Sequence, residues 1–205
     1  MEDWAIFTGD IVKSSAMARA ELSGVFDRLD EAAERIAQWQ DAPSYLTRFR
    51  GDGWQVAVRP GLSFRAALTL RAAVRRGGKT ADSRIAIGIG QAHLAGSSLA
   101  DADGDALVAS GHALDTMPRN RRLSAPEAPL ALRCALPLAD RLATGWTQRQ
   151  AEVAYFMLAP DRPVQAALAE RLALTQQSVQ GHVEAAGLDE LGEICDMLEN
   201  TSETA

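Results

Sequence analysis

Two aspartates stand in sequence contexts that could support metal chemistry. Asp10 lies near the end of the apolar run "WAIFTGDIV", residues 4–12, and Asp52 lies between two glycines in "FRGDGWQ", residues 49–55. Aspartates in such turns often only accept hydrogen bonds from nearby backbone N–H groups. Two carboxylates that meet from separate strand ends are instead the hard oxygen ligands that Mg²⁺ or Mn²⁺ prefers. The chemistry therefore depends on whether the fold brings Asp10 and Asp52 together.

The elements around Asp10 and Asp52 are predicted to end at the same edge of a sheet. Residues 4–12 are predicted to form a buried strand, and residues 18–40 carry apolar side chains three and four apart, which indicates an amphipathic helix. The runs 44–50 and 54–59 flank an Asp-Gly turn, a strong hairpin signal. A right-handed strand–helix–strand crossover sets the first two strands parallel, so both end at the same edge of the sheet. If these strands are neighbours, the two carboxylates approach each other.

The rest of the first 120 residues continues this alternation. A helix with a basic side is predicted over 62–76, a strand over 83–90 and a helix over 104–117. This order of elements predicts an α+β sandwich with the helices on one face of the sheet. Residues 119–145 are predicted to be partly linker and partly a last strand, "LALRCAL".

The C-terminal part of the chain has the pattern of a small all-α domain. Thr147 with Gln150 forms a capping-box signal, and Pro163 is expected at a first helical position. Thr175 is expected to cap a third helix that ends at Gly187, and a fourth helix follows over 188–200. A very short turn between the second and third helices is typical of a helix-turn-helix. We therefore expect two domains, 1–140 and 146–200.

Composition bounds the class of protein. The chain has 205 residues, 47% of them hydrophobic, and a net charge of −6. Its two cysteines give no disulfide or zinc pattern, and no apolar run approaches the length of a membrane span. No signal-peptide pattern is present. These features predict a soluble, cytoplasmic protein with no membrane partner.

Three short motifs in the first part of the chain resemble the class III nucleotide cyclases, a palm-like family, in its shorter SatD-like form. The segment "FTGDIVKS" resembles the first metal motif, "RFRGDGW" resembles the hairpin motif with a basic residue at Arg48, and "RIAIGIGQA" resembles the third motif. The resemblance covers about residues 4–117. It implies a ferredoxin-like, cyclase-like sandwich in which Mg or Mn is held by Asp10, Asp52 and the backbone carbonyl of Ile11.

The same resemblance suggests residues for a nucleotide. Lys13 and Ser14 follow Asp10 in a loop before a helix, where a lysine and helix N–H groups favour phosphate, although the loop could equally be solvated with a serine cap. Arg48 and Arg50 alternate on a strand and share a face, from which they could reach a base or a phosphate, or only protect a sheet edge. His112 is the last candidate for contact with the nucleotide.

The late helix departs from the cyclase pattern. Where cyclases carry an Asn and an Arg, in "V-N-x-A-x-R-L", the segment "LVASGHALD" places Val108 and His112. A neutral histidine does not supply the fixed charge that an arginine offers to a developing phosphate charge. The departure argues for binding of a nucleotide over its turnover, although an active enzyme stays open as an alternative.

The C-terminal segments "WTQRQAEVAYFML" and "LAERLALTQQSVQGHV" resemble helix-turn-helix domains of the sigma-region-four, LuxR or MarR type. In that mapping residues 175–184 form the recognition helix. The side chains that could read base edges there are Thr175, Gln176, Gln177, Ser178, Gln180 and His182. Residues 145–205 carry three Arg against ten Asp or Glu, which weakens affinity for DNA phosphates. A homodimer would offset this weakness, because two half-sites add their affinities.

The sequence therefore favours a ligand-responsive, DNA-binding transcription regulator whose degenerate cyclase-like domain senses a nucleotide or cyclic nucleotide. Two alternatives stay open. One is an active Mg-dependent nucleotidyl cyclase or nucleotidyltransferase, and the other is a protein-interaction adaptor in which both domains are degenerate.

Overall fold

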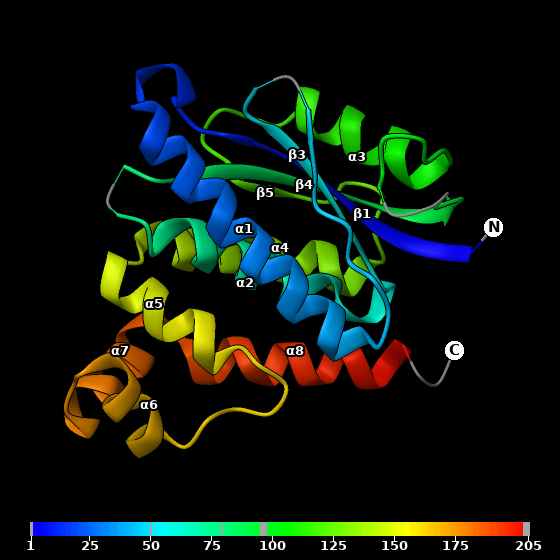
Figure 1. Ribbon diagram of the computed structural model, residues 1–205. Coiled ribbons are helices and arrows are strands. Elements are labelled where there is room, and N and C mark those ends of the chain that lie inside the picture. Colours follow the sequence, from blue (N-terminus) through cyan, green and yellow to red (C-terminus); the bar gives the residue numbers. More distant parts are fainter. Residues whose placement is uncertain (1, 50, 79, 95–97, 203–205) are drawn as a thin grey trace.

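A five-stranded sheet with helices on both faces forms the centre of the protein (Figure 1). The computed structural model describes residues 2–49, 51–78, 80–94 and 98–202. The strands lie in the order β2-β3-β1-β4-β5, and only the β4–β5 pair is parallel. The strands are β1 (Glu2–Ile11), β2 (Thr47–Phe49), β3 (Gly53–Val58), β4 (Ser83–Ala92) and β5 (Leu123–Ser124). The helices are η1 (Ser14–Ala16), α1 (Arg19–Gln40), η2 (Pro60–Leu62), α2 (Ser63–Arg75), α3 (Asp105–Asp115), α4 (Leu130–Gly145), α5 (Gln148–Met157), α6 (Gln165–Leu172), α7 (Gln176–Ala186) and α8 (Leu188–Ser202).

The central strand β1 is buried on both faces. Ala5 and Phe7 belong to the large core that α1 and α2 cover, whereas Trp4 and Ile6 belong to a separate cluster under α3. A strand that is apolar at consecutive positions is typical of a sheet covered on both sides. The mixed α+β class is as predicted, but the expectation of helices on one face only is wrong, because α3 covers the other face (Figure 1).

The strand order differs in one respect from the expectation. β2 runs in the same direction as β1, but β3 lies between them and pairs antiparallel with both. The first two strands are therefore parallel, as predicted, but they are not neighbours, so that condition for bringing the two carboxylates together is not met. The hairpin turn still lies at the end of β1, because β3 begins at Gly53, which pairs with Asp10.

Residues 130–136, predicted as a last strand, begin α4 instead. Leu132, Leu136, Ala139 and Ala143 are its buried apolar side chains, and their spacing of four and three is that of a helix face. Over seven residues the alternation in "LALRCAL" also fits a strand, and Pro137 looks like a break. The helix continues through Pro137, and the last strand is the short β5 just before it.

The capping signals of the C-terminal helices are confirmed. The Thr147 hydroxyl accepts from the Gln150 N–H at 3.2 Å, and the Gln150 amide accepts from the Thr147 N–H at 2.8 Å. Thr175 caps α7 through the Ser178 N–H, and Gly187 ends it with φ of 67°. Such signals are local, so the sequence alone suffices to place them. Pro163 lies one residue before the N-cap of α6 and not inside its first turn.

Helix α2 connects the sheet to the C-terminal helices. All its residues from Ser63 to Val74 are buried, with β4 on one side and α4, α5 and α8 on the other. A single hydrophobic core runs from Phe7 of β1 to Leu168 of α6. The division at 140–146 stays a prediction, and the core is continuous across it. The cysteines do not pair, because Cys134 is exposed and Cys195 is buried.

Candidate functional site at the end of the central strand

Asp10 and Asp52 lie at the same end of the sheet. Asp10 is the next-to-last residue of β1, and its Cα partners are Gly53 on β3 and Arg84 on β4. The Ile11 N–H donates to the Asp52 backbone carbonyl at 3.2 Å, which holds the hairpin turn against the end of β1. The antiparallel pairing of β1 with β3 therefore brings the two aspartates together, although the route differs from the predicted crossover.

The Asp10 carboxylate forms a two-pronged ion pair with Arg84. Arg84 Nε donates to Asp10 Oδ1 at 3.0 Å, and Arg84 Nη2 donates to Oδ2. Both side chains are partly buried. The hydrogen bonds to Asp10 raise the pKa of Arg84 above its usual value against the opposing effect of burial, and the charges of Asp115 and Asp52 add to that rise. This contact therefore favours the charged form of the Arg84 guanidinium.

Asp52 has a neutral partner from the neighbouring loop. The Ser14 hydroxyl donates to Asp52 Oδ2. Lys13 is exposed and has a left-handed backbone with φ of 58°, which turns the chain away after β1. The helix that begins at Ser14 has only three residues, so it offers no array of free N–H groups. Ser14 thus orients Asp52, and Lys13 is the exposed cation of this loop.

The residues present agree in type with a divalent cation, but not in their present pairing. Two carboxylates and a backbone carbonyl are suitable donors for Mg²⁺ or Mn²⁺. Both oxygens of Asp10, however, are bonded to Arg84. In the described part of the chain, no group of three or more His, Cys, Asp or Glu side chains could hold a metal. The guanidinium of Arg84 therefore competes with a cation for Asp10.

The structure does not bring every predicted nucleotide residue to this cluster. Arg48 lies on the other face of the sheet, where its guanidinium stacks on Phe26 of α1 at 3.5 Å from the ring centroid. Arg50 lies outside the described residues. His112 is exposed on α3, one turn before Asp115, and Val108 is 73% exposed one turn earlier still. Neither Val108 nor His112 is packed into a site within the described chain.

The sequence alone missed Arg84 and Asp115 as members of this cluster. Arg84 is the first residue of the motif "RIAIGIGQA", but its partner depends on the register of β1 against β4. Asp115 ends α3 and its charge acts on Arg84. The alternating pattern of β4 gives a weak signal for the face of Arg84 and no signal for the register.

The predicted DNA-reading residues gather at the start of α7. Thr175, Gln176 and Gln177 are exposed, and Ser178, Gln180 and His182 are half-buried. Three of the glutamines, together with Gln165 of α6, line an open groove of about 380 Å³. The Gln165 amide donates to Gln180 at 2.7 Å, and Gln180 donates to Glu184 at 2.6 Å. Gln176 and Gln177 are therefore the glutamines that face solvent, whereas the Gln180 amide is occupied by hydrogen bonds with Gln165 and Glu184.

Comparison with known proteins gives no family assignment. No family model matches the chain, and no curated protein matches it. Among solved structures it is similar to the catalytic core of a rhodopsin-guanylyl cyclase with converted specificity, at 20% identity over 56% of this chain and 72% of that one, with a TM-score of 0.42. A bacterial light-regulated adenylyl cyclase is 19% identical over 59% of this chain and 73% of that one, with a TM-score of 0.43.

A third similar structure is the guanylate cyclase domain of RhGC from Catenaria anguillulae in complex with GTP. It is 17% identical over 56% of this chain and 73% of that one, with a TM-score of 0.39. The structural neighbours are thus nucleotide cyclase domains. Because the TM-scores are below 0.5, these similarities carry no argument about function, and the proposal below depends on the residues of this chain. Among the described residues, no helix has both the length and the hydropathy needed to cross a bilayer.

Proposed function

We propose that the protein is a DNA-binding regulator that senses a nucleotide or cyclic nucleotide at the Asp10–Asp52 end of its sheet. The observation that supports this most directly is the meeting of Asp10 and Asp52 at one sheet end, beside the exposed Lys13. A loop with a lysine and two carboxylates can receive a phosphate together with its Mg²⁺ or Mn²⁺. Asp10, Asp52 and the Ile11 carbonyl would hold such a cation, which would neutralise phosphate charge there.

The side chains on the outer face of α3 favour binding of a nucleotide without its turnover. Cyclases carry an Asn and an Arg on this helix. The matching positions of this chain hold Val108 and His112, and both side chains are exposed. Valine has no polar group to offer a phosphate, and histidine has no permanent charge. Arg84 is the cation nearest to the carboxylates, and it is already paired with Asp10. The site would therefore hold a nucleotide, and α3 would offer no fixed positive charge to stabilise a reaction of that nucleotide.

DNA binding is proposed for α7 with α6. The segment from Pro163 to Gly187 carries one Arg and two Glu, a net charge of −1. Much of the remaining acid lies on α8, where Asp196 and Glu199 pair with Arg65 and where Asp189 pairs with Arg162. Three of the acidic side chains that argue against DNA binding are thus already paired with arginines, which reduces their effect on a bound DNA.

Ligand and DNA would be linked through a shift between two arrangements of the recognition helices in a homodimer. A ligand that binds one arrangement more tightly increases its population, and the spacing of two α7 helices decides the fit to two half-sites. The continuous core from β1 to α6 supports such a link, because α5 and α8 rest directly on α2 and α7 rests on α5.

The proposal is tested first by a thermal-shift panel. ATP, GTP, cyclic AMP and cyclic GMP are added to the protein with and without Mn²⁺, and a ligand of the folded state raises the melting temperature. We expect a rise that is lost in Asp52→Asn. Lys13→Gln should reduce it, and Gln38→Ala, an exposed change on α1, should leave it unchanged.

The second test is a mobility shift on the DNA that flanks the gene of this protein. Loss of a side chain that contacts a base costs about 1–3 kcal/mol, so Gln177→Ala should weaken binding about tenfold. Gln180→Ala should act less, because Gln180 is bonded to Gln165 and Glu184. Steady formation of a cyclic nucleotide that stops in Asp52→Asn would instead show an active cyclase. Failure to bind DNA at low salt, with and without nucleotide, would favour the adaptor.

A further inference from the structure

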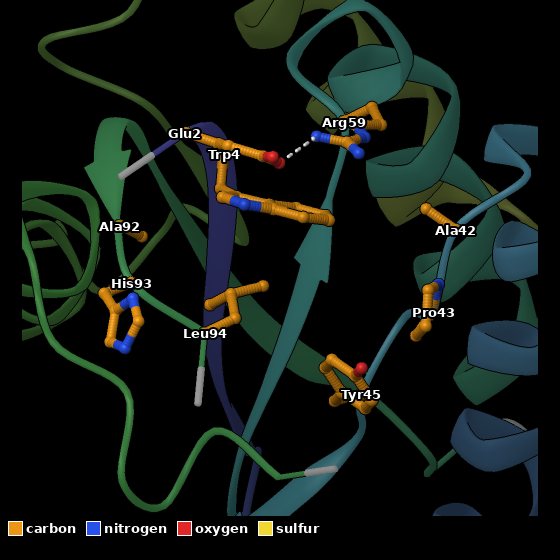
Figure 2. A pocket seen from close by; sticks show the side chains of 9 residues that line it. All are labelled: Glu2, Trp4, Ala42, Pro43, Tyr45, Arg59, Ala92, His93 and Leu94. Carbon is orange, nitrogen blue, oxygen red and sulfur yellow. Dashed lines mark hydrogen bonds and ion pairs between the residues drawn. The ribbon is translucent and has the colours of Figure 1, made fainter. Parts of the chain in front are cut away.

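A second cavity lies at the other end of the sheet from Asp10. It has a volume of about 310 Å³, and Figure 2 shows the side chains that surround it. Trp4 and Asp10 are six residues apart on β1, which places them about 20 Å from each other along the strand. The cavity is therefore separate from the proposed nucleotide site. Its lining residues are Glu2, Trp4, Ala42, Pro43, Tyr45, Arg59, Ala92, His93 and Leu94.

One wall of the cavity is an aromatic ring with a guanidinium beside it. The Arg59 guanidinium lies over the Trp4 ring, with Cζ at 4.3 Å from the centroid. Arg59 Nη1 also donates to Glu2 Oε2 at 3.0 Å. Both partners of that ion pair are exposed, and such pairs contribute little stability. Arg59 is therefore fixed in position by the ring while its charge stays open to competition from a ligand.

The other walls are held by hydrogen bonds. Gln40 accepts from the Arg59 N–H at 2.8 Å, and its amide donates to the carbonyls of Ala42 and Pro43 at 3.1 and 3.0 Å. The Ser44 hydroxyl donates to the Ala57 carbonyl at 2.8 Å, which fixes the segment before Tyr45 against β3.

The wall on the β4 side is fixed in the same way. His93 and Asp103 exchange two backbone hydrogen bonds, of 2.8 and 3.2 Å. The cavity is thus already formed in the free protein, so a ligand would lose little affinity to ordering of the walls.

We propose that this cavity binds a small planar aromatic carboxylate. Tyr45 offers aromatic surface and Leu94 offers apolar surface beside the largely buried Trp4 ring, so a flat apolar ring is favoured. Arg59 offers a two-pronged donor that suits a carboxylate, which would replace Glu2 as its partner. The volume is near the lower limit for ligand pockets and suits one ring.

The charge of the cavity excludes larger anions. Arg59 is the one arginine or lysine in its lining, and Glu2 lies beside it. A triphosphate would bring several negative charges to one guanidinium that has the Glu2 carboxylate beside it. A cationic ligand would meet Arg59 already in place over the Trp4 ring. A ligand with a single negative charge on an aromatic ring avoids both problems, because one guanidinium suffices for its charge and Arg59 does not repel it.

The test is calorimetric titration of the full chain with benzoate and two relatives. Benzamide keeps the ring and lacks the charge, whereas cyclohexanecarboxylate keeps the charge and lacks the planar ring. We expect benzoate to bind at least about tenfold more tightly than either, because both the guanidinium and the ring contribute. Binding should also change the tryptophan fluorescence of the wild type, and this change should be smaller in Trp4→Phe.

Two variants and two controls make the result decisive. Arg59→Gln should weaken benzoate about tenfold and leave benzamide unchanged. Arg133→Gln, in a different cavity of about 250 Å³, should leave benzoate binding unchanged. Asp52→Asn should also leave it unchanged, which separates this site from the nucleotide site. The proposal is overturned if benzoate fails to bind at millimolar concentration, if cyclohexanecarboxylate binds as tightly, or if Arg59→Gln has no effect.

Discussion

The pairing of Asp10 with Arg84 is the residue-level fact that decides how a cation could enter the site. The Arg84 guanidinium donates to both oxygens of Asp10 and neutralises the negative charge that a metal ion would otherwise neutralise. Metal and Arg84 therefore compete for the same two oxygens.

Removal of the guanidinium should make the site a better metal site. We expect Arg84→Gln to bind Mn²⁺ about tenfold more tightly than the wild type, because the ion no longer displaces a charged hydrogen-bonded partner. Titration of Mn²⁺ followed by electron paramagnetic resonance measures this directly, without any nucleotide. The double variant Arg84→Gln with Asp10→Asn should lose the gain. Equal affinity in the wild type and Arg84→Gln would contradict competition at Asp10.

Only part of this site could be predicted from residues. The Gly-Asp turn fixes Asp52 at a hairpin, and the apolar run fixes Asp10 at a strand end, because both signals are local. The partner of Asp10 is set by the register of β1 against β4, which no local pattern specifies. Arg48 illustrates the same limit, since its side chain stacks on Phe26 from a helix more than twenty residues earlier.

At the scale of elements, helix ends were easier to predict than sheet neighbours. The caps at Thr147 and Thr175 and the stop at Gly187 depend on residues three or four positions away. The seven residues from Leu130 to Leu136 fit both a strand and a helix face, and packing on α2 and β5 decides for α4. The position of α3 on the second face depends on both faces of β1 being apolar, which a one-sided sandwich does not require.

The contact of α3 with the sheet rests on a glycine. A Cβ at Gly88 would come within 2.2 Å of the Ala106 carbonyl and 2.5 Å of the Ser110 N–H. Gly88→Ala should push α3 away from β4 and disturb the 2.7 Å hydrogen bond between Thr8 and Ser110. We expect a loss of about 2–3 kcal/mol in the free energy of unfolding, measured by urea denaturation.

Gly111 supplies the matched control for that prediction. It lies inside α3, and a Cβ there would meet no atom within 4 Å. Gly111→Ala should therefore stabilise the protein by about 0.5–1 kcal/mol, because alanine favours the helix more than glycine does. If Gly88→Ala is as stable as the wild type, the close approach of α3 to β4 is wrong.

At the scale of the whole molecule, one buried arginine connects the last helix to the sheet layer. Arg65 of α2 is 1% exposed, and it donates to Glu199 at 2.5 and 2.9 Å, to Asp196 at 2.6 Å and to the Leu158 carbonyl at 2.9 Å. Burial alone would lower the pKa of Arg65, but the bonds to Glu199 and Asp196 hold it above its usual value. The guanidinium is therefore charged, and it depends on α8 for its counter-charge.

The two carboxylates on α8 should contribute unequally to stability. The Glu199 side chain is 23% exposed and binds Arg65 through both oxygens, whereas Asp196 is 61% exposed and binds through one. Glu199→Gln should lower the free energy of unfolding by about 2 kcal/mol, because it leaves a buried charge with a weaker partner. Asp196→Asn should cost less than about 1 kcal/mol, because water already screens that contact.

Urea denaturation followed by both circular dichroism and tryptophan fluorescence tests this prediction. Trp54 lies in β3 and Trp146 lies at the start of the C-terminal helices, so fluorescence reports on both parts of the chain. Because one core joins the two parts, the two signals should change in a single transition that moves to lower urea in Glu199→Gln. Two separate transitions in the wild type would mean that α8 and the sheet unfold independently. An equal loss in Glu199→Gln and Asp196→Asn would mean that burial does not decide the strength of the Arg65 contacts.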